Sequence, residues 1–297
     1  MYKKAPLFIA IFSTLAFGAW SQNYQQQFRD LSASGDTAAQ AKILQQWAVA
    51  KPTDPELFIA YFNYYVFKSR SEIASLDKDK KAGEGLVLTD SAGKTAGYMN
   101  FTMQYNTELL QKGFQYIDKA ISLYPTRLDM RFGKAYMLGQ MGDYASYTKT
   151  ITTAVDYGNS IGYKWLWKEG KPLQDAKQFF TNTLQEYVVA IYNTEDDNLL
   201  PYMRQIAESV LKYMPDHVES LSNVALTYLV TEEYDKALPY LLKAEGQSPK
   251  DIVILNNIAV AYAAKKDKAN AKAYYEKIIK HGNREEVENA KNKIKTL

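Results

Sequence analysis

The sequence predicts an all-α protein: a right-handed α-α superhelix of stacked helix pairs, with one small β-hairpin inserted between two helices. Three observations support this fold class. Apolar residues near the C-terminus recur at a fixed interval of 34 residues. Within each unit they stand three, four and seven residues apart, which places them on one face of a helix. Prolines stand near the ends of the units, where they stop a helix because proline cannot continue it.

The recurrence is clearest over residues 218–251 and 252–283. A small alanine in each first helix allows a neighbouring helix to approach closely, and larger residues fill the space around it. Self-similarity at this period is typical of repeat proteins, in which each unit buries its apolar face only against its neighbours. The matched positions are Leu221 and Leu255, Val224 and Ile258, Ala225 and Ala259, Tyr228 and Tyr262, Ala237 and Ala271, Leu241 and Tyr275, and Pro215 and Pro249.

The first 21 residues are typical of a secretory signal peptide. Lys3 and Lys4 are followed by a 15-residue stretch without charge, and small residues stand at Ala19 and Ser21. The apolar stretch is shorter than the roughly 20 residues that span a bilayer, so an uncleaved anchor is the less favoured alternative. Because the chain has no cysteine, it cannot be a lipoprotein or form disulfides. We therefore expect a periplasmic or secreted protein without stable membrane insertion after processing.

Proline spacing reveals two insertions before the regular units. Pro52 and Pro125 are 73 residues apart, which exceeds one repeat by 39 residues. Pro125 and Pro215 are 90 residues apart, which exceeds two repeats by 22. These two additions distinguish this chain from a uniform array of repeats.

The first insertion, at about residues 69–99, separates a first helix (Pro55 to about Phe67) from its partner (about Thr102 to Leu123). Ser69 to Gly97 is charged, contains glycine and has no helical periodicity. Within it, Leu86-Val-Leu-Thr and Thr95 to Met99 flank the turn-forming residues Asp90 to Lys94. This arrangement predicts a β-hairpin that projects from the helices.

The second insertion, at about residues 157–172, brings three large aromatic residues close together: Tyr163, Trp165 and Trp167. We favour the interpretation that these rings fill the break in the repeat, since large rings bury much area. The alternative is a surface anchor for a partner, because Trp and Tyr dominate binding hot spots. Helices over 173–193 and 197–214 are expected to follow.

A capping helix is predicted at the C-terminus, over residues 284–296. Asn283 and Glu286 have the spacing of a capping box at its start. Val287, Ala290 and Ile294 lie on one face, and charged residues lie elsewhere. A terminal cap requires one face to bury and another to remain in water.

These patterns resemble the tetratricopeptide repeat, whose first helix carries Leu and a small residue before Tyr and whose second carries Ala, a large residue and a closing Pro. The resemblance covers Leu221 to Pro249 almost throughout; in the next unit Asn283 replaces the proline. Asp36-Thr-Ala and Asp90-Ser-Ala also resemble a short glycosylation sequence of exported Bacteroidetes proteins. The resemblance to the tetratricopeptide repeat implies a protein or peptide partner in a concave groove. The groove-lining residues that it implies are Glu219, Ser222, Leu226, Leu229, Val253, Asn256, Val260 and Ala263.

No motif in the sequence indicates catalysis, a cofactor or a metal. Gly93-Lys94-Thr95 resembles the end of a phosphate-binding loop, but Leu88 occupies the position of the required glycine, so we interpret the segment as a turn. His217 and His281 have no ligand spacing and are expected to be solvated or to cap helices. The formal charge of +3 falls to +1 without Lys3 and Lys4, which gives no general attraction for nucleic acid.

The sequence therefore predicts a non-catalytic adaptor or scaffold that binds a protein or peptide in the periplasm or outside the cell. A structural subunit of a cell-envelope assembly is the alternative. An enzyme with an unrecognised site in the insertions is a third hypothesis, and it would require clustered titratable groups in a pocket. The oligomeric state is left open.

Overall fold

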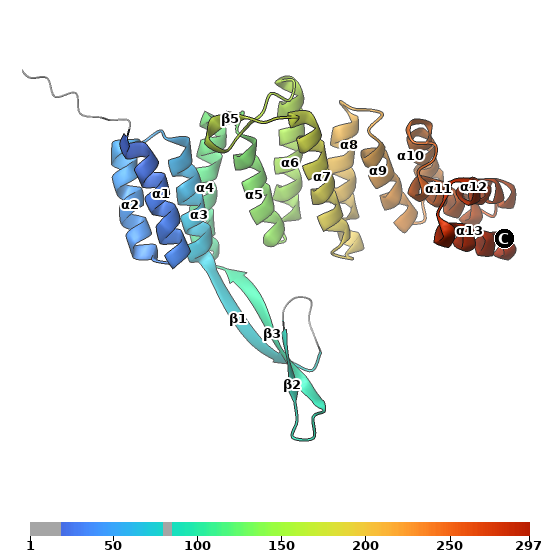
Figure 1. Cartoon of the computed structure of the whole chain (residues 1–297), viewed down its shortest axis with the longest axis horizontal. Helices are drawn as coiled ribbons and strands as arrows, with labels where there is room; N and C mark the ends of the chain where they lie inside the picture. Colours follow the sequence, from blue (N-terminus) through green and yellow to red (C-terminus); the bar gives the residue numbers. More distant parts are fainter. Residues whose placement is uncertain (1–18, 80–84) are drawn as a thin grey trace, which may run out of the picture. The chain divides into compact units, whose positions relative to one another are not determined.

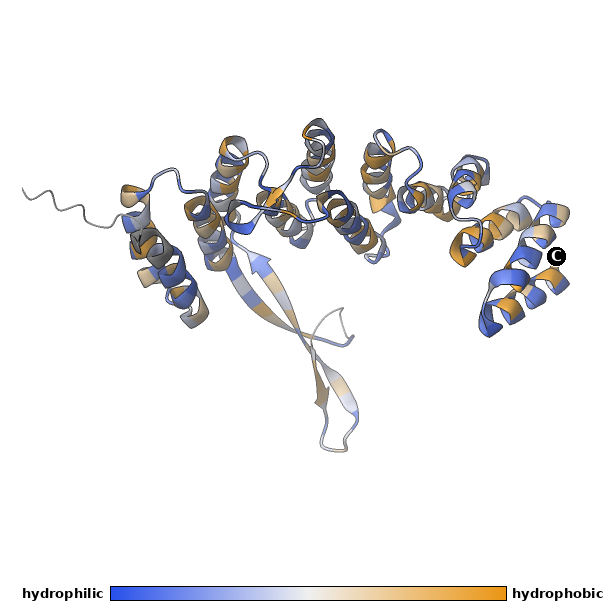
Figure 2. Ribbon diagram, turned by 45° about the horizontal axis from the view of Figure 1, so that its top comes forward, coloured by the Kyte–Doolittle hydropathy of each residue, from blue (hydrophilic) through white to orange (hydrophobic). Residues whose placement is uncertain are grey.

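The computed structural model of the protein describes residues 19–79 and 85–297 (Figure 1). The predicted signal peptide, residues 1–21, lies outside this part of the chain except for its last three residues. Within the described residues the helices form six successive pairs and a final single helix. Each helix carries both apolar and polar residues (Figure 2). The chain divides after Tyr124 into two compact units, which are described separately.

The first unit contains two helix pairs. Asp54 begins the third helix by accepting a hydrogen bond from the backbone N–H of Glu56, and its other carboxylate oxygen accepts one from Trp47 Nε1 at 3.0 Å. Leu44 and Trp47 are fully buried, so the second helix is fixed against the third. The helices are α1 (Ala19–Ser34), α2 (Thr37–Ala50), α3 (Pro55–Ser69) and α4 (Thr107–Leu123).

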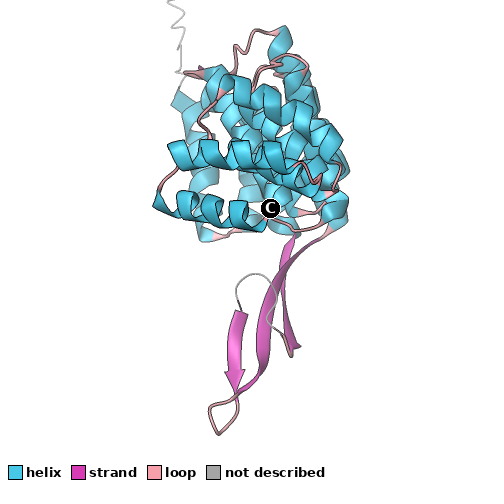
Figure 3. Ribbon diagram, turned by 90° about the vertical axis from the view of Figure 1, so that its right-hand side faces the viewer, coloured by secondary structure: helices cyan, strands magenta, loops and turns pink. Residues whose placement is uncertain are grey.

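A three-stranded antiparallel sheet is inserted between α3 and α4, and it extends away from them (Figure 3). Its strands are β1 (Arg70–Asp77), β2 (Gly85–Thr89) and β3 (Thr95–Tyr105), in the order β1-β3-β2. The predicted turn between β2 and β3 is present, because Asp90 Oδ1 accepts hydrogen bonds from the backbone N–H groups of Ala92 and Lys94. The segment is therefore a turn between two strands and does not lead into a helix, as a phosphate-binding loop would.

Two details of this insertion were predicted wrongly. The expected hairpin is a three-stranded sheet, because Arg70 to Asp77 pairs with Tyr105 to Tyr98. The helix expected from Thr102 begins at Thr107, since residues 102–105 belong to β3. Asn106 then begins α4, and its Oδ1 accepts a hydrogen bond from Leu109 N.

The second unit continues the helix pairs. The repeat positions Ala225, Ala237, Ala259 and Ala271 are completely buried, which lets the helices pack closely. The predicted all-α architecture of stacked helix pairs with an inserted β-structure is confirmed. The helices are α5 (Leu128–Gln140), α6 (Tyr144–Ser160), α7 (Ala176–Tyr192), α8 (Leu200–Leu211), α9 (Val218–Val230), α10 (Tyr234–Gln247), α11 (Ile252–Ala264), α12 (Lys268–His281) and α13 (Arg284–Thr296).

The aromatic insertion lies between α6 and α7. It begins later than the sequence indicated, because α6 continues to Ser160 and so includes Tyr157. The connection contains β4 (Leu166–Trp167), a short 3₁₀ helix (Lys168–Gly170) and β5 (Lys171–Pro172), and the two strands pair antiparallel.

The final helix, α13, begins with the predicted capping box. Asn283 Oδ1 accepts hydrogen bonds from the backbone N–H groups of Glu285 and Glu286. Glu286 Oε2 in turn accepts one from Asn283 N at 2.7 Å. Ala290 is buried against α11 and α12, so α13 covers one face of the last repeat.

Candidate functional site

The residues expected to line the groove lie on α9 and α11, and none of the eight is buried. Val253 and Val260 are 66% and 39% exposed, although both are apolar. Glu219 and Asn256 are also exposed. The remaining four are half-buried: Ser222, Leu226, Leu229 and Ala263. The first helices of the two regular repeats thus present an accessible surface, and on α11 it is partly apolar.

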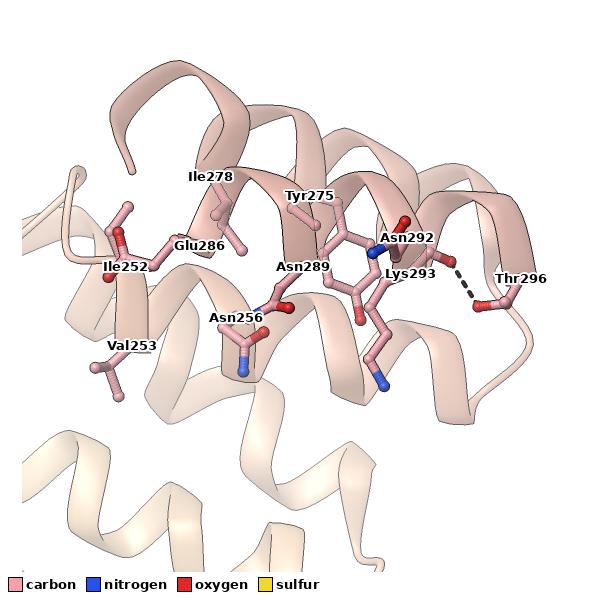
Figure 4. A pocket seen from close by; sticks show the side chains of 11 residues that line it. Ile252, Val253, Asn256, Tyr275, Ile278, Glu286, Asn289, Asn292, Lys293 and Thr296 are labelled. Carbon is pink, nitrogen blue, oxygen red and sulfur yellow. Dashed lines mark hydrogen bonds between the residues drawn. The ribbon is translucent and has the colours of Figure 1, made fainter. Parts of the chain in front are cut away.

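A cavity of about 600 Å³ lies between α11 and α13 (Figure 4). Val253 and Asn256, both predicted from the sequence, line it. Ile252, Ile278 and Ala290 add an apolar surface, and Asn289 and Asn292 add side-chain amides. Figure 4 shows Asn256 of α11 beside Asn289 of α13.

A second cavity, of about 410 Å³, lies further along the same two helices. Val260 and Ala263, also predicted from the sequence, line it. Tyr275 and Lys293 line both cavities. We refer to the two cavities together as the terminal slot. It combines apolar side chains with amides, two hydroxyls, three lysines and the carboxylate of Glu286, which suits an extended peptide better than a flat apolar partner.

Sequence reasoning missed the contribution of α13 to this slot. A signal was available, because Val287-x-Asn289-Ala290 repeats the spacing of Leu255-x-Asn257-Ile258. α13 therefore occupies the place of a further first helix. It was interpreted only as a cap, and Asn289 and Lys293 were not considered as site residues.

A third cavity, of about 700 Å³, lies at the beginnings of α7 and α9. Glu219, His217, Lys177 and Tyr163 line it. His217 caps α9 as the sequence predicted, since its Nδ1 accepts a hydrogen bond from Ser220 N. Burial lowers the pKa of His217; Glu219, 3.4 Å away, opposes this effect and Lys177 adds to it.

The aromatic insertion is largely internal. Trp165 is 1% exposed and Tyr163 is 9% exposed, and both rings contact Phe180 of α7. Gly158 makes room for Trp165, because a Cβ there would lie 3.0 Å from Trp165 Cζ2. This burial agrees with the favoured interpretation, that the rings of Tyr163 and Trp165 fill the break in the repeat. Contact of these two residues with a partner stays an untested alternative. Trp167 is half-buried, and its contact with a partner stays a prediction.

The inserted sheet of the first unit has one predominantly apolar face. Paired residues of antiparallel strands share a face, so Leu76, Leu86 and Met99 lie together. Phe101 and Met103 continue this face along β3. Leu76, Leu86 and Met103 are 71%, 58% and 46% exposed. Large exposed apolar patches mark interaction sites.

The fold defines the class as a helical-repeat protein, and its last two repeats have accessible first helices. Residues 252–280 match the family model of the tetratricopeptide repeat. The chain thus contains the repeat that its residue spacing predicted. Comparison with curated proteins gives no match.

Several solved structures of tetratricopeptide proteins are similar at low identity. YrrB, described as a tetratricopeptide protein with an unusual peptide-binding site, is 14% identical with a TM-score of 0.41; the match covers 84% of this chain and 97% of that one. A protein from Parabacteroides merdae is 13% identical with a TM-score of 0.35, over 93% and 85%. The C-terminal part of a protein from Cytophaga hutchinsonii is 14% identical with a TM-score of 0.42, over 86% and 78%.

Over the described residues, no helix has both the length and the apolar character required to cross a membrane.

Proposed function

We propose that this chain is a non-catalytic scaffold or adaptor that binds an extended protein segment along its first helices in the periplasm or outside the cell. The observation that carries the proposal is the terminal slot. Val253 and Val260 leave apolar surface exposed beside the amides of Asn256 and Asn289. Amide side chains satisfy the backbone of an extended peptide, and the apolar surface takes its side chains.

Other residues expected on this surface fit the same role. Glu219, Ser222, Leu226 and Leu229 of α9 are accessible. Glu219 also lines the third cavity, beside His217. An extended segment that crosses α9 would therefore reach this cavity as well as the terminal slot. We propose that α9 and α11 bind different parts of one partner.

Site-specific photo-crosslinking in the native cells tests this proposal. A photoreactive phenylalanine at Val253 or Val260 should give the same discrete adduct, identified by mass spectrometry. The same residue at Lys272, which is exposed on α12, is the control and should give none. Equal adducts at all three positions would exclude the groove as the binding surface. Sequencing the N-terminus of the exported protein tests whether cleavage follows Ser21.

A stable subunit of a cell-envelope assembly is the second candidate, and the apolar face of the inserted sheet favours it. Permanent interfaces are more apolar than transient ones. Replacing Leu76 and Leu86 by Asp should release the protein from a stoichiometric complex isolated from envelope extracts. If the native protein is recovered without stoichiometric partners, this candidate is wrong and the adaptor proposal is unaffected.

A further inference from the structure

The cavity at the Val260 end of the terminal slot is lined by three lysines. Lys266 lies in the turn between α11 and α12, Lys268 is the first residue of α12, and Lys293 comes from α13. Among the described residues, no aspartate or glutamate side chain lines this cavity. The three lysines give the lining a net positive charge.

These lysines form no ion pair within the part of the chain that the structure describes, whereas two neighbouring lysines do. Lys265 pairs with Asp235, and Lys291 pairs with Glu288. The nearest carboxylate in sequence, Asp267, is occupied in capping α12, and the hydrogen bonds from Asn270 lower its pKa. Three lysines that line one cavity and form no ion pair attract an anion, and partial desolvation in a cavity strengthens the attraction.

Apolar groups and the hydroxyl end of one tyrosine line the same cavity. Val260, Ala263 and Leu297 line the cavity, and the side chain of Tyr275 is 2% exposed. The hydroxyl of Tyr275 has no hydrogen-bond partner in the described chain, and Tyr275 lines the same cavity as Lys293. Burial raises the pKa of Tyr275, so the hydroxyl keeps its proton and can donate a hydrogen bond.

We propose that the terminal slot selects peptide segments in which an acidic side chain stands next to an apolar one. The carboxylate would lie among Lys266, Lys268 and Lys293 and accept a hydrogen bond from Tyr275. The apolar neighbour would pack against Val260, and the amide-rich cavity would hold the adjoining backbone. This inference rests on the proposed function, since it names the chemistry of the segment bound there. Lysines alone would be enough to attract the phosphates of a nucleic acid. The additional apolar lining therefore favours a peptide as the ligand.

Selection from a random dodecapeptide library displayed on phage, with the full exported chain as the target, tests the inference. Selected peptides are synthesised with amidated C-termini, and their affinities are measured by fluorescence anisotropy. We expect Asp or Glu beside an apolar residue. Replacing the three lysines by Gln should weaken binding by about tenfold or more, with about two- to fivefold from each. Added salt should weaken binding to the parent chain more than to this variant.

Two control variants make the result specific. Lys272, Lys280 and Lys291 are exposed on α12 and α13 and do not line the cavity. Replacing these three by Gln removes the same charge and should leave the affinity unchanged. Val253→Asp places a charge in the groove and should abolish binding of every selected peptide.

The outcomes separate this inference from the proposed function. If Val253→Asp abolishes binding but the peptides lack acidic residues and tolerate loss of the three lysines, the slot binds peptides without this preference. The inference is then wrong and the proposed function stands. A requirement for a free C-terminal carboxylate would overturn the assignment to a side chain. If the selected peptides still bind Val253→Asp, both are overturned. Lysine-dependent binding of a DNA oligonucleotide, with no peptide selected, would also overturn both.

Discussion

The side-chain amides of Asn223 and Gln185 join α9 to α7. Asn223 Nδ2 donates a hydrogen bond to Gln185 Oε1 at 2.6 Å, and Asn223 is buried. The side-chain amide of Asn223 is thus used in a hydrogen bond within the protein. Asn256, which lies on the following first helix, is exposed and lines the terminal slot.

This difference predicts opposite effects for two asparagine variants. Asn223→Ala should lower the free energy of unfolding by about 1–3 kcal/mol, because the amide of Gln185 loses its buried partner. Asn256→Ala should leave stability unchanged within about 0.5 kcal/mol and weaken binding of a selected peptide. Urea denaturation followed by circular dichroism measures the first effect, and anisotropy measures the second. Equal losses of stability in both variants would contradict the assignment of Asn256 to the ligand.

Trp165 is expected to be essential for the stability of the second unit. Trp165→Ala should cost about 3–5 kcal/mol, since it leaves a cavity beside Phe180. Arg131 would also lose a ring contact, because its guanidinium lies 5.8 Å from the centre of the Trp165 ring. Thermal unfolding measures the change. Trp167→Ala is the matched control and should cost less, because Trp167 is only half-buried.

The hydroxyl of Tyr163 gives a prediction of the opposite sign. It is buried and has no hydrogen-bond partner among the residues that the structure describes. Tyr163→Phe removes this unsatisfied group and keeps the ring against Phe180, so stability should be unchanged or rise by up to about 1 kcal/mol. A loss of more than about 1 kcal/mol in denaturant titration would show that the hydroxyl has a partner in solution.

His217 predicts a dependence of stability on pH. Burial holds its pKa below the ordinary value of 6.5 in the folded chain, so the unfolded chain binds a proton first as the pH falls. Stability from this residue is therefore present above pH 6.5 and is lost as the pH falls below it. His217→Asn keeps a capping side chain but does not titrate. Its free energy of unfolding should fall less than that of the parent between about pH 7.5 and 5.5.

The inserted sheet should be removable without unfolding the helices that flank it. Asn106 N donates a hydrogen bond to Ser69 O at 2.7 Å, so the chain leaves α3 and returns to α4 at one place. A short glycine linker in place of residues 70–105 should shift the melting temperature by only a few degrees, about what a loss of 1 kcal/mol causes. Gly113→Leu is the contrasting variant. Even a Cβ added at Gly113 would lie only 3.2 Å from Tyr65 Cβ, so a leucine side chain has no room there.

The sequence was sufficient for the repeats because their packing is local and periodic. Leu255, Ala259 and Tyr275 occupy the expected buried positions, since each unit contacts mainly its neighbours. Strand β1 was not predicted, because Arg70 to Asp77 mixes charged and apolar residues without a clear alternation. The segment is a strand because it pairs with β3. Register depends on a partner strand, which one segment of sequence does not contain.

The candidate site was predictable in part. Residues such as Val253 and Val260 follow from helical spacing, because an exposed face is fixed once the buried face is known. Their relation to Lys266 and Lys293 depends on how the second helix of the repeat and α13 pack against α11. That packing places Val260 and Lys293, 33 positions apart, in one cavity and Val253 and Lys293, 40 positions apart, in the other, which spacing within one helix cannot reveal.

Tyr275 corresponds to Leu241 one repeat earlier, and both are almost completely buried. Leucine fills that position with carbon alone, whereas tyrosine carries a hydroxyl through the packed interior to the wall of the slot. One side chain therefore contributes both to the packing of the last repeat and to the lining of the terminal slot. Mutations that reshape this repeat would also change its selectivity, so the two properties are under shared constraint.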